Sequence, residues 1–200
     1  MSEIGTGRSR DAKPAAQRVR EAARDLFYRQ GIHATGVEEV CRAAGTTKMS
    51  LYRAYPSKDA LIEAILQERC DAQRGFAHVA QDESLSPRDR PMAFVNIAVA
   101  SLMTPGFRGC PLGLAVVEFP DAGHPVRRVA DGHKQSVRDT LRGLCAEAGA
   151  PSPETLGDAL QILIEGAYAV APSLGNEAAS RSLENAARTL IEASLPPQGD

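Results

Sequence analysis

Apolar residues recur at helical spacing through most of the chain, and residues that end helices separate these segments. The clearest case lies near the start, at positions i, i+3, i+4, i+7 and i+8: Val19, Ala22, Ala23, Leu26 and Phe27. This spacing predicts an amphipathic helix, which we expect to begin at Pro14 and to end at Gly31. Long alternations of Val, Ile, Thr and Tyr, which are typical of strands, are missing. The pattern predicts an all-α protein of about nine helices.

Two short helices separated by a tight turn follow within residues 37–58, VEEVCRAAGTTKMSLYRAYPSK. Gly45 stands where a helix would end in a left-handed residue. Either Thr46 or Thr47 can then cap the next helix by accepting backbone N–H bonds. The apolar face of the first short helix consists of Val37, Val40, Cys41 and Ala44.

The second short helix is polar on one side and apolar on the other. We expect Met49 and Leu51 to anchor it, and Tyr55-Pro56 to end it. A helix, a Gly-containing turn and a short polar helix form the pattern of DNA-binding helix-turn-helix proteins. The polar side carries Lys48, Ser50, Tyr52 and Arg53.

The remaining segments divide the chain into an arm, a head and a body. The polar residues 1–13 are expected to form a disordered arm, which is either a tail without a role or a basic arm that touches DNA through Arg8, Arg10 and Lys13. The helix-turn-helix head should occupy residues 14–57, and the body residues 58–200. Body helices are expected from Lys58 to about residue 81 and over 92–103, 112–118, 126–147, 155–171 and 178–195.

The last two helices are too apolar to be covered by one partner face. Residues 155–171 are apolar around most of the helix, and residues 178–195 repeat apolar positions at helical spacing. A four-helix bundle formed with a second copy of the chain would bury both helices. The alternative is that both helices pack only within their own subunit.

Charge is distributed unevenly along the chain, although its formal net charge is only −2. Residues 1–58 hold 11 Lys and Arg against 6 Asp and Glu, whereas residues 59–200 hold 12 against 19. A basic front suggests a polyanionic partner at that end. The four cysteines are widely spaced, which argues against a disulfide framework and for a reducing, cytoplasmic location. We expect neither a secretory signal nor a membrane span.

Other residue groups suggest weaker alternatives. One alternative is a metal site formed by Glu118, Asp121, His124 and His133. Their spacing matches no fixed ligand pattern, however, and such residues more often cap helices. Cys110 follows Arg108 closely, so it is either a reactive thiol that senses oxidants or electrophiles, or a small buried side chain. The chain shows no GxSxG, GxGxxG or P-loop motif, and we therefore expect no enzyme activity and no cofactor.

Residues 15–66 resemble the N-terminal domain of TetR-type transcriptional regulators. The most specific part runs from Ala44 to Leu61: AG, a capping Thr, LY, then an aromatic-Pro-Ser-Lys and a Leu. The stretch RGCPLGLAVVEFPDAGHPVRRVADGHK also looks like a segment found in one branch of these regulators. The resemblance implies a cytoplasmic homodimer that pairs through its last two long helices. It also implies a near-palindromic double-stranded DNA operator and release of that operator, as in a repressor, when a small effector binds the body.

The resemblance also implies which residues bind DNA. Tyr52 matches the phosphate-contacting Tyr of the family, and Lys58 matches the Lys that begins the fourth helix. Gly36 and Ala54 depart from the family pattern, in which Ser or Thr and His are frequent. Lys48 and Arg53 are long enough to reach guanine O6 and N7 in the major groove. The full predicted set is Thr35, Gly36, Thr46, Thr47, Lys48, Met49, Ser50, Tyr52, Arg53, Tyr55 and Lys58.

An effector pocket in the body is expected to be mostly apolar with a few polar anchors. For each candidate residue, ordinary core packing is an equal alternative. The effector would tilt the helix that starts at Lys58 and so change the spacing of the two heads. The candidate lining residues are Phe94, Ile97, Met103, Phe107, Cys110, Leu114, Glu118, Phe119 and Tyr168.

Overall fold

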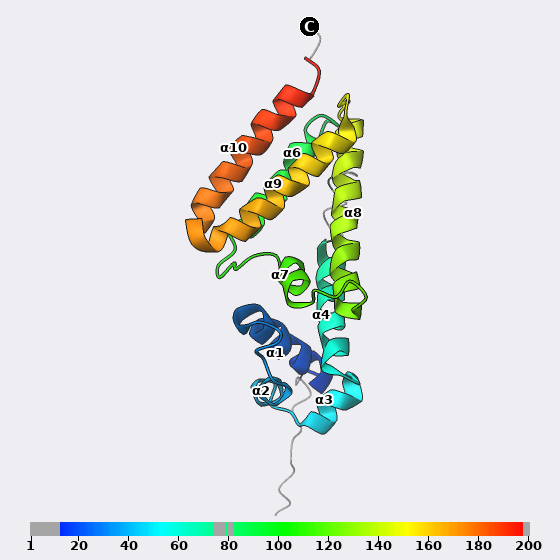
Figure 1. The fold of residues 1–200 in the computed structure, drawn as a ribbon, viewed down its shortest axis with the longest axis vertical. Coiled ribbons are helices and arrows are strands. Elements are labelled where there is room, and N and C mark those ends of the chain that lie inside the picture. Colours follow the sequence, from blue (N-terminus) through cyan, green and yellow to red (C-terminus); the bar gives the residue numbers. More distant parts are fainter. Residues whose placement is uncertain (1–12, 74–78, 80–81, 198–200) are drawn as a thin grey trace, which may run out of the picture. The chain divides into compact units, whose positions relative to one another are not determined.

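The computed structural model describes residues 13–73, 79 and 82–197, and every regular element within these ranges is a helix (Figure 1). The prediction of an all-α protein is therefore confirmed. The described helices are α1 (Ala15–Gln30), α2 (Val37–Ala43), α3 (Lys48–Ala54), α4 (Lys58–Gln73), α6 (Arg90–Leu102), α7 (Pro111–Glu118), α8 (Pro125–Glu147), α9 (Pro153–Leu174) and α10 (Asn176–Ser194).

Most helix boundaries follow the predicted apolar periodicity and caps. The main difference is at α9, which starts at Pro153 and continues beyond the predicted end at residue 171 to Leu174. Pro172 lacks the N–H that would bond the carbonyl of Tyr168, but its fixed φ is helical, so a last turn can follow it. Residues 1–12 of the predicted arm, most of residues 74–81 and the last three residues lie outside the described residues.

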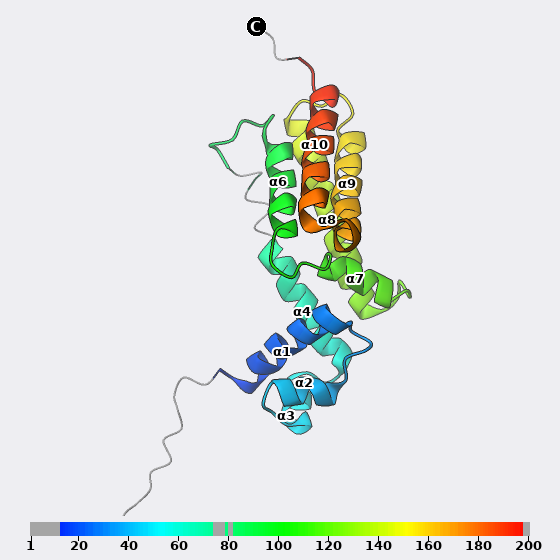
Figure 2. The ribbon, with the colours of Figure 1, turned by 90° about the vertical axis from the view of Figure 1, so that its left-hand side faces the viewer.

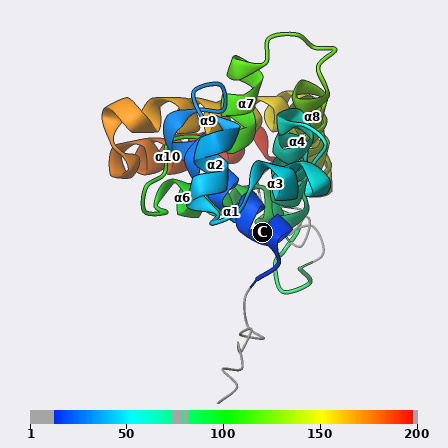
Figure 3. The same cartoon turned by 90° about the horizontal axis from the view of Figure 1, so that it is seen from below.

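The chain forms two compact units, Met1–Ile62 and Glu63–Asp200, and the boundary between them falls within α4. In the first unit, α2 and α3 pack against α1 and against each other (Figure 3). The apolar face of α1 supplies the centre of this core, as its spacing predicts. The buried side chains from these three helices include Val19, Ala23, Phe27, Val40, Cys41 and Leu51. The functional division expected at residue 58 remains a prediction.

Leu51, not Met49, anchors α3 to this core. Leu51 is fully buried, whereas the side chain of Met49 is 73% exposed. Residues two positions apart on a helix point about 200° away from each other, so both cannot face the same core. The expectation that Met49 is an anchor is therefore wrong, and Met49 lies on the outer surface of α3.

In the second unit, α9 packs between α8 and α10, and α6 contacts all three of these helices (Figure 2). Gly175, with φ of 85°, separates α9 from α10 and allows the chain to reverse. The core is almost wholly aliphatic, with Val95, Leu102, Leu141, Leu144, Leu160, Ile164, Leu183 and Ala187 among its buried residues. None of the described helices is long and apolar enough to cross a membrane.

The backbones of α8 and α9 approach each other closely at Gly157. A Cβ atom at this position would lie 2.7 Å from the backbone nitrogen of Arg142 and 2.9 Å from its Cα. The next residue, Asp158, accepts two hydrogen bonds from Arg142, at 2.7 and 2.8 Å, and two from Arg138, at 2.7 and 2.5 Å. These two guanidinium groups hold the pKa of Asp158 well below its usual range. A small residue and a paired carboxylate thus join the two helices.

Replacing Gly157 with Ala should destabilise the protein, because the added methyl group would meet backbone atoms that cannot move aside. We expect the free energy of unfolding to fall by about 1–3 kcal/mol. Gly143→Ala on α8 is the matched control: nothing lies within 4 Å of its Cβ position, and the loss of a helical glycine should raise stability by about 0.5–1 kcal/mol. Chemical denaturation measures both, and equal stability of the two variants would contradict the close contact.

Candidate nucleic-acid interface and ligand pocket

The helix α3 presents a largely exposed outer surface above a single buried anchor. Of the two predicted caps, Thr47 takes this role: its hydroxyl oxygen accepts the backbone N–H of Ser50 at 3.2 Å. The side chain of Met49 is the most exposed large apolar one on this helix, and Tyr52 is 47% exposed. Arg53 is also exposed. Of the residues that resembled DNA-contacting positions, those exposed to solvent on and just before α3 are Thr47, Lys48, Met49, Tyr52 and Arg53.

The turn before α3 is held by an arginine that the sequence did not single out. Gly45 has φ of 59°, and the N–H of Thr46 donates to Cys41 O at 3.0 Å, which closes the end of α2. From α1, Arg18 donates to the carbonyl of Ala44 at 3.0 Å and to that of Gly45 at 3.3 Å. The planar guanidinium group holds its donors in a rigid fork, so Nε and Nη2 bind the two neighbouring carbonyls in a fixed geometry.

The structure corrects one predicted contact just before α2. Thr35 is fully buried, and its hydroxyl donates to Gly31 O at 2.8 Å. Its side chain therefore supports the loop between α1 and α2 and does not reach the surface. Gly36, the N-cap of α2, is exposed but has no side chain to cap the helix. The backbone alone is available for an anion at that end of the helix.

Two other predicted DNA contacts also make hydrogen bonds within the head. The hydroxyl of Tyr55 donates to Ala16 O at 3.4 Å, which ties the end of α3 to α1. The ammonium of Lys58 donates to Ile32 O at 2.5 Å and lies 5.7 Å from the centre of the Phe27 ring. An ammonium has three donors, so Lys58 can hold the loop and still offer hydrogen bonds to a phosphate.

Lys48, the first residue of α3, forms an ion pair with Glu38 in the first turn of α2. Both side chains are more than half exposed. Their mutual hydrogen bond is the main cause that lowers the pKa of Glu38 and raises the pKa of Lys48. Both groups are therefore charged at neutral pH. A carboxylate beside a lysine expected to contact DNA was not recognised from the sequence.

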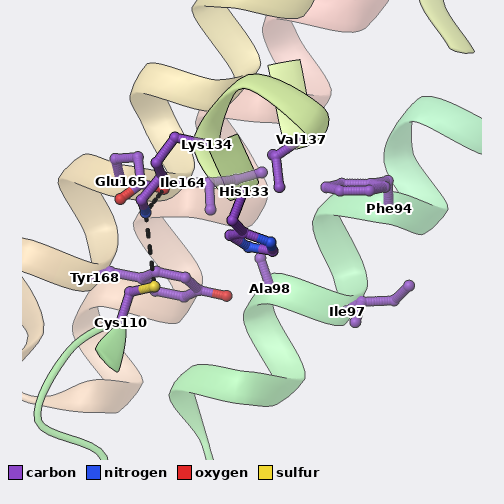
Figure 4. Close-up of a pocket in the computed structure, with 10 residues that line it drawn as sticks. All are labelled: Phe94, Ile97, Ala98, Cys110, His133, Lys134, Val137, Ile164, Glu165 and Tyr168. Carbon is purple, nitrogen blue, oxygen red and sulfur yellow. Dashed lines mark hydrogen bonds and ion pairs between the residues drawn. The ribbon is translucent and has the colours of Figure 1, made fainter. Parts of the chain in front are cut away.

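The second unit contains a small cavity between α6, α8, α9 and the start of α7 (Figure 4). The cavity volume is about 30 Å³, which accommodates a few waters at most. A larger ligand would therefore require side chains to move. The lining residues are Phe94, Ile97, Ala98, Cys110, His133, Lys134, Val137, Ile164, Glu165 and Tyr168.

Polar groups are set among the apolar walls of this cavity. Burial, with the nearby charges of Lys134 and Arg69, lowers the pKa of His133 to about 4, so its imidazole is neutral at pH 7. Burial also raises the pKa of Tyr168 to about 12. Lys134 forms an ion pair with Glu165 and donates to Cys110 Sγ at 3.6 Å. In Figure 4 the imidazole lies between the Tyr168 ring and the side chains of α6.

Four of the predicted ligand-binding residues line the cavity, namely Phe94, Ile97, Cys110 and Tyr168. Met103 is instead half exposed, and the Phe107 ring packs against that of Tyr168 with centres 5.2 Å apart. Leu114, Glu118 and Phe119 are also absent from the lining. The sequence did not place Lys134 and Glu165 in the cavity, and it suggested His133 only as a metal ligand. Nothing in the local pattern of α8 and α9 separates an inward-facing polar residue from a solvated one.

The described residues hold no group of three His, Cys, Asp or Glu side chains that could bind a metal ion. His124 instead caps α8 through Nδ1, which accepts the N–H of Val126 at 3.3 Å, while Asp121 accepts the N–H of Gly123 at 2.8 Å. Cys110 is buried at the start of α7. A thiol sensor at this position is therefore not supported.

Comparison with known proteins gives matches to the head and to the whole chain. Residues 19–65 match the family model for bacterial regulatory proteins of the tetR family. The crystal structure of SCO4454, a TetR-family transcriptional regulator from Streptomyces coelicolor, is 30% identical and superposes with a TM-score of 0.86, covering 90% of this chain and 96% of that one.

Two curated regulators are also similar. YxaF, an HTH-type transcriptional regulator of Bacillus subtilis, is 26% identical over 75% of this chain and 81% of its own length. DhaR, an HTH-type transcriptional repressor of Mycobacterium sp., is 30% identical over 57% of each chain.

Arg18→Lys should loosen the turn before α3, because lysine lacks the rigid guanidinium fork whose Nε and Nη2 reach the carbonyls of Ala44 and Gly45 separately. We expect the free energy of unfolding to fall by about 1–2 kcal/mol. If DNA affinity falls, the slope of the logarithm of the association constant against the logarithm of the salt concentration should not change. Loss of a direct phosphate contact would instead reduce the steepness of that slope by about 1. Arg24→Lys, at an exposed ion pair with Asp25 on the same helix, is the control.

Proposed function

Because this chain belongs to the TetR family of transcriptional regulators, we propose that it acts in the cytoplasm as a homodimeric repressor that leaves its operator when a small molecule binds the second unit. Its relatives and its fold are those of DNA-binding regulators rather than enzymes. One relative over 57% of the chain is named as a repressor, which supports that direction of control.

The observation that carries the proposal is the solvent-facing surface of α3. Leu51 is buried, and the residues around it that can contact bases or phosphates project outward from a capped, firmly anchored helix. A short helix held in this way fits the major groove. In the proposed interface Tyr52 and Lys58 contact phosphates, Lys48 and Arg53 read base edges, and Thr47 and Ser50 contribute hydrogen bonds.

An exposed apolar stripe on α9 supports a dimer. Ile162, Gly166, Val170 and Leu174 are spaced four residues apart, so they lie along one face of the helix. Their exposure in a single chain is high: 71% for Ile162 and 63% for Leu174. α10 adds the exposed small residues Ala186 and Ala193. A second copy placed on this face, as in a four-helix bundle, would remove these side chains from water.

The cavity of the second unit is the proposed effector site, and α4 is the proposed connection to the head. The charge of Arg69 in the second half of α4 acts on both His133 and Tyr168, which line the cavity. Lys58, at the start of the same helix, is bonded to the carbonyl of Ile32. A ligand that widens the cavity would therefore change the surroundings of a helix that also belongs to the head.

Selection of bound duplexes from random DNA tests the operator. We expect two inverted half-sites whose centres lie about one helical turn, or a multiple of it, apart.

Tyr52→Phe should weaken binding about tenfold on every sequence, because it removes only a phosphate contact. Arg53→Gln should instead change the selected bases. Asymmetric single sites, or no selected sequence, would contradict the proposal. The selected duplex then serves to find small molecules that release it.

Ile162→Glu should convert the dimer to monomer, because the carboxylate would be buried without a partner in the proposed interface. Sedimentation equilibrium measures the change. Val117→Glu is the matched control, since Val117 on α7 is 79% exposed but lies outside α9 and α10. A dimer that persists in Ile162→Glu, or a monomer in Val117→Glu, would place the interface elsewhere.

A further inference from the structure

The contact between Glu38 and Lys48 joins the two helices of the helix-turn-helix at its exposed surface. Lys48 begins α3, and Glu38 lies in the first turn of α2. The two side chains form an ion pair while remaining 53% and 64% exposed. Exposed pairs of this kind contribute little to stability. Both side chains are therefore accessible to solvent, and their pairing has only a weak effect on the free energy of unfolding.

We infer that Glu38 competes with DNA for the Lys48 ammonium, and so makes binding selective for sequences that offer Lys48 a base contact. This inference rests on the proposed role of α3. A phosphate or a guanine that binds Lys48 either displaces the carboxylate of Glu38 or uses the remaining donors of the ammonium with that carboxylate still beside it. The loss of the Glu38–Lys48 pair is thus a cost that every DNA contact of Lys48 has to overcome.

The penalty differs in its effect on correct and incorrect sequences. On the right sequence, Lys48 exchanges Glu38 for guanine O6 and N7, and the base contact compensates for the lost pair. On other sequences only phosphates are available, and these are common to all DNA. A carboxylate in this position therefore lowers nonspecific binding more than specific binding, which increases the ratio between them.

The chain provides a matched control in the next residue. Glu39 lies in the same first turn of α2 and carries the same charge at the same helix end. Its carboxylate instead accepts a hydrogen bond from Gln30 Nε2 at 3.0 Å. Changing either residue to Gln removes one negative charge from the head, but only the change at Glu38 releases Lys48.

The experiment uses the full chain and two duplexes, one selected from random DNA by the wild-type protein and one with the same bases shuffled. Glu38→Gln should bind the shuffled duplex about two- to fivefold more tightly than Glu39→Gln does. The gain on the selected duplex should be smaller, so the specificity ratio falls. Melting curves followed by circular dichroism should show both variants folded, with melting temperatures close to that of the wild type.

A Lys48→Met background separates pairing from general charge repulsion. There, Glu38→Gln and Glu39→Gln should have equal effects on binding to the shuffled duplex, because no lysine remains to be released. Equal effects of the two changes on affinity for the shuffled duplex in the wild-type background would overturn the inference. So would a larger gain in that affinity for Glu38→Gln than for Glu39→Gln when position 48 is Met. If the wild-type protein selects no duplex at all, the proposed operator binding is wrong instead.

Discussion

The packing of Leu51 against the rest of the first unit is the contact on which the proposed DNA-binding surface depends. α3 has only seven residues, which is far too short for a helix that is stable alone in water. It exists because Leu51 is buried, Thr47 caps its start and the Tyr55 hydroxyl is bonded to α1. Arg18 holds the preceding turn at its carbonyls. All outward-facing residues of α3 take their positions from these few contacts.

In the second unit a single helix, α9, combines several roles along its length. Near its start, Gly157 and Asp158 join it closely to α8. Further along, Glu165 and Tyr168 line the cavity, while Ile162 and Val170 face solvent. Substitutions that affect one role can therefore alter the others through the position of the helix. The pairing of charged groups within the unit, as in Lys134 with Glu165, limits the cost of burying them near an apolar cavity.

The two departures from the usual TetR pattern, Gly36 and Ala54, remove side chains that could contact DNA. Thr35 does not replace them, because it is buried and bonded to Gly31. In the proposed interface, α3 and the start of α4 are therefore the main source of side-chain contacts to DNA from the described part of the head. Within that smaller set, the partner of Lys48 matters more, because each remaining cation accounts for a larger share of the electrostatic attraction to DNA.

The sequence alone determined the helices and the family, because helix periodicity, caps and breakers are local properties that neighbouring residues encode. It also predicted a threonine cap before α3, which the structure places at Thr47, and four of the residues that line the cavity. It did not show that Thr35 faces inward and Met49 outward. Nor did it show that Arg18 binds the turn before α3 or that Glu38 pairs with Lys48. Those facts depend on how helices pack across turns and over long sequence separations. Only the tertiary structure decides which polar side chains meet, because many pairings are compatible with the same helical pattern.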